Sequence, residues 1–187
     1  MTTAAPSPAS ADALAAHALA AGALAAGALA ADTIATDPLA LERQVCFALA
    51  VAARNVIGVY RPVLERLDLT HPQYLVMLAL WERSPLSVTE IGRLLQLDLP
   101  TLSPLLKRLE ALGHVDRRRN PADERSLQVT LTPSGLALRE EALAVPGAVM
   151  ETLDLTEADV VALHAALVPL IARSRAALAV RTAGPRP

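Results

Sequence analysis

The 187-residue sequence contains one cysteine, Cys46, and a thiolate at this position could attack a peroxide to give a sulfenic acid. Free cysteines are also often buried as small apolar side chains, and without further information Cys46 fits that interpretation better. A single cysteine excludes an internal disulfide and a cysteine-based zinc site, and it is typical of a reducing compartment. We therefore expect a cytoplasmic protein without metal or cofactor.

A second group of residues with binding chemistry lies between Arg93 and Arg125. Seven basic residues there outnumber five acidic ones, although the whole chain has a net charge of −2. Such local positive charge is typical of a surface that meets the phosphates of nucleic acid, although an arginine run can also be a solvated face. The basic residues are Arg93, Lys107, Arg108, Arg117, Arg118, Arg119 and Arg125.

Residues 101–131 predict the element that presents this charge. Leucines at steps of three and four give one helix an apolar stripe, and Gly113 ends the helix. Residues 115–119 and 127–131 then read as two strands around a polar tip at 120–126. A short helix followed by a basic hairpin is typical of a winged helix-turn-helix, which places the helix in the major groove and the wing against the minor groove. The leucines are Leu102, Leu105, Leu106, Leu109 and Leu112.

The segment just upstream supports DNA binding over an ordinary small α+β domain. Ser87 precedes Glu90 by three residues, which predicts a capping box and a second short helix over 87–97. Residues 98–100 would link the two helices tightly. We therefore assign the DNA-reading part to residues 85–131.

Long apolar helices are predicted on both sides of this part. Before it, a striped helix over 39–67 is followed by a buried helix over 70–81 with Pro72 in its first turn. After it, a helix from 132 to about 145 is broken at residues 146–147, and a last helix over 156–181 should kink at Pro169. Because these flanking helices are long for one small domain, they predict a homodimer. The fold class is mainly α with a small β-wing: a winged helix-turn-helix homodimer over residues 38–183.

Residues 1–37 are compositionally separate. Ala, Leu and Gly dominate, and ALAAG occurs twice at a five-residue step, which matches no helical face. No Lys or Arg precedes the uncharged run at 13–31, and Ala and Gly are far less apolar than the Leu, Ile and Val of a membrane-spanning helix. We therefore expect a disordered tail and no membrane anchor.

Five runs of the sequence resemble the MarR family of winged-helix regulators, and within it the single-cysteine organic hydroperoxide sensors known as OhrR. The resemblance extends from about residue 41 to residue 135. The runs are QVCFAL (44–49), YRPVLERLDLT (60–70), PQYLVMLALWE (72–82), TLSPLLKRLEALG (101–113) and DERSLQVTLT (123–132).

The resemblance implies that Cys46 is the peroxide-reactive residue, with Tyr60 among the tyrosines around its thiolate. His71 and Ala50 stand where other family tyrosines are often found, and His71 could supply a hydrogen-bond donor instead. Cys46 and Tyr60 are fourteen residues apart, about 21 Å along one continuous helix, so a Tyr60 that donates to the thiolate must come from the partner chain of a dimer. With no second cysteine, a small thiol could trap the sulfenic acid, unless it reacts with a backbone nitrogen or oxidises further.

Candidate DNA contacts follow from the predicted helix and wing. Arg125 at the wing tip is expected in the minor groove, with Asp123 as the carboxylate that holds it. Lys107 and Arg108 are expected to meet phosphates, whereas the side chains of Thr101 and Ser103 could reach base edges. At the entry to this helix Leu99-Pro100 replaces a usual Ser-Gly pair of the family, so operator contacts there do not carry over.

We predict a homodimeric repressor that leaves its operator in double-stranded DNA when an organic hydroperoxide oxidises Cys46. One alternative keeps the fold but has a small aromatic ligand as the signal and Cys46 as a packing residue. A thiol peroxidase is the other, and it is disfavoured because no resolving cysteine is present. We therefore do not expect an enzyme.

Overall fold

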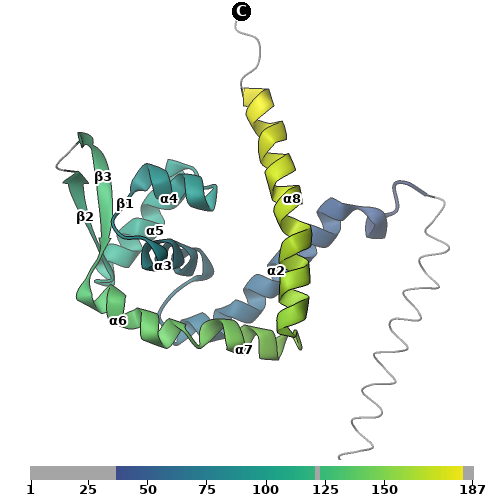
Figure 1. Cartoon of the computed structure of the whole chain (residues 1–187), viewed down its shortest axis with the longest axis horizontal. Coiled ribbons are helices and arrows are strands. Elements are labelled where there is room, and N and C mark those ends of the chain that lie inside the picture. Colours follow the sequence, from purple (N-terminus) through teal and green to yellow (C-terminus); the bar gives the residue numbers. More distant parts are fainter. Residues whose placement is uncertain (1–36, 121–122, 183–187) are drawn as a thin grey trace, which may run out of the picture. The chain divides into compact units, whose positions relative to one another are not determined.

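The computed structural model describes residues 37–120 and 123–182 (Figure 1). The chain divides after Arg54, within helix α2 (Val45–Glu65), into two units. The described part of the first unit contains the short 3₁₀ turn η1 (Leu41–Arg43) and the start of α2. Gln44 has an extended backbone and separates the two, so the helix predicted over 39–67 begins later and ends earlier than expected. Pro62 lies inside α2 without ending it.

The second unit is mainly helical with a small antiparallel sheet, which confirms the predicted fold class. Its elements in chain order are α3 (His71–Glu82), β1 (Leu86–Ser87), α4 (Val88–Leu95), α5 (Leu99–Ala111), β2 (Val115–Asn120), β3 (Asp123–Leu131), α6 (Pro133–Ala142), α7 (Val145–Thr152) and α8 (Glu157–Thr182).

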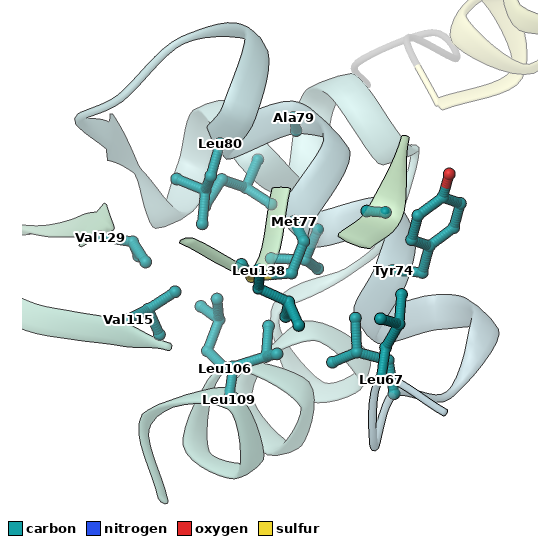
Figure 2. Close-up of a cluster of buried hydrophobic side chains, with 14 of the residues drawn as sticks. Leu67, Tyr74, Met77, Ala79, Leu80, Leu106, Leu109, Val115, Val129 and Leu138 are labelled. Carbon is teal, nitrogen blue, oxygen red and sulfur yellow. The ribbon is translucent and has the colours of Figure 1, made fainter. Parts of the chain in front are cut away.

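The core of this unit forms around α3 and α5. Helix α3 buries Tyr74, Met77 and Leu80, as expected for a helix that is apolar on almost all sides. Their neighbours Leu106 and Leu109 come from the leucine stripe of α5 (Figure 2). Each buried leucine contributes about 1.5–3 kcal/mol by leaving water, so this stripe anchors α5 firmly.

The sheet has the strand order β1-β3-β2, and its first strand was not predicted. Leu86 pairs with Val129, and Val115 pairs with Leu131. Leu86 lies between the helices predicted over 70–81 and 87–97, and it begins β1 because its buried side chain completes the sheet's apolar face. Strand β3 begins at Asp123, so the wing tip is shorter than the predicted 120–126.

The link between α4 and α5 lies earlier in the sequence than the predicted residues 98–100. Helix α5 begins at Leu99, because the Asp98 carboxylate accepts a hydrogen bond of 3.0 Å from the Thr101 N–H and caps the helix. Pro100 therefore lies in the first turn, where the missing N–H of proline has no partner to lose. The predicted link at 98–100 is in fact a helix start.

The break predicted at residues 146–147 is also wrong. Helix α6 ends at Ala142, and Pro146 and Gly147 lie in the first turn of a separate helix, α7, that buries Val145 and Val149. Proline is favoured in a first turn, and this is why the same residue that suggested a break begins a helix. The Trp81 indole N–H donates to the Gly135 carbonyl at 2.8 Å and joins α3 to α6.

Helix α8 confirms the last predicted helix, and it continues through Pro169. Every side chain from Glu157 to Ala179 is exposed, including large apolar ones such as Leu163, Ile171 and Leu178. By length and composition alone, α2 and residues 157–179 of α8 could each cross a membrane. The predicted tail at 1–37 lies outside the described residues except for Asp37.

Candidate DNA interface and thiol site

The helix-turn-helix is formed by α4 and α5, and a capping box fixes the start of α4. The Ser87 N–H donates to the Glu90 carboxylate at 2.8 Å, and the Glu90 N–H donates to the Ser87 hydroxyl at 3.2 Å. The Ser87 hydroxyl also donates to the Glu90 carboxylate at 2.8 Å, and the two hydrogen bonds that this carboxylate accepts from Ser87 lower its pKa. The capping box predicted from the sequence is thus confirmed.

The four predicted contact residues on α5 are all exposed. Thr101, Ser103, Lys107 and Arg108 lie away from the buried stripe, so the helix can present them to DNA. Ser103 donates its hydroxyl to the Leu99 carbonyl at 2.7 Å. The Thr101 side chain, and next its backbone N–H, lower the pKa of the Asp98 carboxyl because both stabilise the charged form.

Arg108 and Lys107 have different surroundings. Arg108 lines a cavity of about 270 Å³ together with Glu65 and Asp68. The Glu65 carboxylate pairs with Arg61 at 3.5 Å, and Arg108 remains exposed. Lys107 is exposed and lines none of the described cavities.

The wing is tied to α5 by an ion pair that the sequence analysis missed. Arg117 on β2 donates through Nε, at 2.9 Å, and through a terminal nitrogen to Glu110 near the end of α5. This hydrogen bond lowers the pKa of Glu110. Arg118 pairs with Asp116 at 3.3 Å on the exposed side of the strand. Asp123 and Arg125 lie on β3, but their side chains are outside the described part of the protein.

Cys46 is exposed in the first turn of α2. The packing interpretation requires a side chain that is buried in the core of its own chain, and Cys46 is not buried in this way. The first unit contains no other predicted site residue.

The two other predicted redox residues, Tyr60 and His71, meet in the second unit. Their ring centroids are 5.2 Å apart in an edge-to-face arrangement. Burial lowers the pKa of His71, so its imidazole is neutral at neutral pH and can donate one N–H. The pair thus offers two hydrogen-bonding groups side by side.

Tyr74 extends this aromatic group and was not predicted as a site residue. Its ring centroid is 6.1 Å from that of Tyr60 and 6.2 Å from that of Trp81. Burial raises the pKa of Tyr74, and the negative charge that Tyr60 carries when it is ionised raises it further. Its position three residues after His71 on α3, hence on the same side of the helix, was the signal that could have identified it.

A leucine-striped helix presented beside a two-stranded wing and preceded by a capped short helix defines a winged helix-turn-helix DNA-binding protein. The sequence profile of the MarR family matches residues 69–127. The organic hydroperoxide resistance transcriptional regulator of Bacillus subtilis is 40% identical over 131 residues, which cover 70% of this chain and 89% of that protein. The chain belongs to the MarR family of transcriptional regulators, and the resemblance to organic hydroperoxide sensors is confirmed.

Two further similarities support this assignment. The regulator TtmR of Methylorubrum extorquens is 50% identical over 107 residues, which cover 57% of this chain and 55% of TtmR. The structure of reduced AbfR, a protein of Staphylococcus epidermidis, bound to DNA has a TM-score of 0.59 and 35% identity, covering 71% of this chain and 93% of AbfR. A structure of overoxidized AbfR bound to DNA matches equally well. TtmR is a transcriptional regulator and AbfR binds DNA, in agreement with a DNA-binding regulator of the MarR family.

Proposed function

We propose that this protein is a repressor that leaves its operator when Cys46 is oxidised by an organic hydroperoxide. The observation that carries the proposal is the exposed position of Cys46, the chain's only cysteine, at the start of α2. A relative named for organic hydroperoxide resistance, 40% identical, supports the choice of oxidant.

The proposed reaction has one oxidising step. The Cys46 thiolate attacks one peroxide oxygen, the O–O bond breaks, and the alcohol leaves as an alkoxide that takes up a proton. Cys46 becomes a sulfenic acid, and the hydroperoxide is reduced to the alcohol. A small thiol would then condense with the sulfenic acid to give a mixed disulfide and water. The oxidised side chain is larger and more polar than a thiol, and this change would disturb packing around the start of α2.

The proposed pocket is completed by the partner subunit. The phenol of Tyr60 and the neutral imidazole of His71 lie side by side and could both donate hydrogen bonds to a thiolate. Since a continuous α2 would separate Cys46 from Tyr60 by about 21 Å, we assign the donors to the other chain of a homodimer. His71 would replace a phenol that family members often use.

The homodimer would be built by the exposed apolar surfaces of α2 and α8. Residues such as Leu163, Leu167 and Leu170 are about half exposed and repeat at helical spacing. A second copy of the chain would cover them, and membership of a family of DNA-binding regulators favours this occupant over a lipid bilayer. We accordingly place the protein in the cytoplasm.

In the proposed complex with the operator, different residues contact the phosphates and the bases, as the sequence predicts. Lys107 and Arg108 would meet phosphates, and Thr101 and Ser103 would lie against base edges. On the wing, Arg125 would enter the minor groove with Asp123 beside it.

Intact-protein mass spectrometry in parallel with operator binding tests the proposal. Treatment with one equivalent of cumene hydroperoxide should add 16 Da to Cys46, or the mass of a thiol adduct when a small thiol is present, and DNA release should follow the modified fraction. Release without modification of Cys46 would favour the small-ligand alternative. Modification without release would leave Cys46 reactive but exclude it as the sensor.

A further inference from the structure

The outward face of α5 carries three exposed apolar residues in its first two turns and no charged side chain. Leu99 is 55% exposed, and Pro100 and Pro104 are exposed beside it. Residues four positions apart lie on the same side of a helix, so Leu99 and Ser103 form one row and Pro100 and Pro104 form the next. This half of the helix contacts base edges when a helix-turn-helix docks in the major groove.

One of the two hydroxyl groups on this surface already uses its hydrogen within the protein. Ser103 donates to the Leu99 carbonyl at 2.7 Å and keeps only acceptor lone pairs for a base, while the Thr101 N–H caps the helix through Asp98. Prolines add no N–H donor.

The cationic side chains of α5 lie further along the helix. Lys107 follows Ser103 by one turn, and Arg108 follows Pro104 by one turn, so both lie beyond the first two turns of the helix. Arginine or lysine reading guanine, a common base-specific contact, is therefore not provided by the first two turns of α5. Apolar contact remains, and the apolar group that a base pair presents in the major groove is the 5-methyl of thymine.

We propose that Leu99, flanked by the Pro100 ring, reads a thymine methyl group in each half of the operator. Leu99 is thus a specificity-determining residue that selects thymine by van der Waals contact and excludes cytosine, which lacks the methyl group. This readout depends on DNA binding alone and holds whether or not Cys46 is the sensor.

The test begins with binding sites selected from a random duplex library by the full-length reduced protein. In the selected duplex, each thymine is replaced in turn by deoxyuridine, which has the same hydrogen-bonding edge without the methyl group. Replacement of the contacted thymine should weaken binding by about fourfold, the effect of exposing roughly one methyl group, and the other replacements should have little effect.

Two variants assign the effect to a residue. In Leu99→Ala, replacement of the contacted thymine by deoxyuridine should cost less than about 1.5-fold, because the methyl group has lost its partner. Leu136→Ala, on α6, is the matched control: Leu136 is 56% exposed, much like Leu99, and this variant should keep the fourfold penalty. Thermal melting of both variants checks that each remains folded.

Three results would overturn the inference. A selected consensus without an invariant thymine in each half would exclude thymine readout. A flat deoxyuridine scan with the wild-type protein would show that no methyl group is contacted. A penalty retained in Leu99→Ala would assign the contact to another residue.

Discussion

Gly135 occupies a position where any side chain would collide with the backbone. An added Cβ would lie 2.0 Å from the His114 carbonyl oxygen, and Gly135 also accepts the Trp81 hydrogen bond that joins α3 to α6. Gly135→Ala should lower the free energy of unfolding by about 1–3 kcal/mol, because the backbone must move to admit the methyl group. Urea denaturation measures this change.

Gly147→Ala is the matched control. A Cβ at Gly147, in α7, would meet no atom within 4 Å, and alanine is the better helix former by about 1 kcal/mol. This variant should be as stable as the wild type or slightly more stable. Equal destabilisation by the two substitutions would contradict the packing described around Gly135.

His71 should make stability depend on pH in the weakly acidic range. Burial lowers its pKa from 6.5, so the unfolded chain takes up the proton more readily than the folded one. The contribution of neutral His71 to the free energy of unfolding is fully present above pH 6.5. It is lost as the pH falls through the pKa that His71 has in the folded protein, which is below 6.5. In His71→Gln, the decrease in the free energy of unfolding between pH 7 and pH 5 should be smaller than in the wild type.

The wild type, measured over the same pH range, is the reference for this comparison. If His71→Gln and the wild type show the same slope, His71 is not the group that titrates.

At the residue scale, the sequence predicted the exposure of side chains better than it predicted the ion pairs that they form. Thr101, Ser103, Lys107 and Arg108 were placed correctly on the outer face because helical periodicity fixes direction. The Glu110–Arg117 pair joins a helix to a strand, and no short-range spacing encodes such a contact.

At the scale of elements, this ion pair should position the wing rather than bind DNA. Arg117→Gln should lower operator affinity by up to about fivefold, since an exposed pair contributes up to about 1 kcal/mol. The dependence of affinity on salt should stay unchanged, because Arg117 is bound to Glu110 and releases no counterion from DNA. Fluorescence anisotropy over a salt series measures both quantities.

Arg125→Ala should behave differently. Loss of a cation from the wing should weaken binding and reduce the salt slope by about one. An unchanged slope in Arg125→Ala would remove Arg125 from the interface, whereas a reduced slope in Arg117→Gln would place Arg117 there.

The helices and wing strands could be predicted because their periodicity extends over several residues. Strand β1 has two residues, too few for any period, and it exists only because β3 lies beside it. The start of α7 was missed because Pro146 and Gly147 read as a break until the burial of Val145 and Val149 is known. Tertiary packing decided both cases.

At the scale of the whole molecule, the proposed dimer can be tested through α8. Leu167→Asp would bury an unpaired carboxylate in the interface and should weaken dimerisation by at least roughly 100-fold. Ala172 lies on the opposite side of α8 by helical spacing, and Ala172→Asp adds the same charge there. Light scattering after size exclusion should give a monomer for the first variant and a dimer for the second; dimers for both would place the interface elsewhere.

The central claim concerns the only cysteine, and operator binding by Cys46→Ser tests it most directly. Serine is close in size to cysteine but cannot be oxidised by a hydroperoxide, so the variant should bind operator as the reduced wild type does. After treatment with cumene hydroperoxide the wild type should release DNA, and Cys46→Ser should stay bound. Release of the serine variant at the same hydroperoxide concentration would contradict the account, because the signal would then act without Cys46.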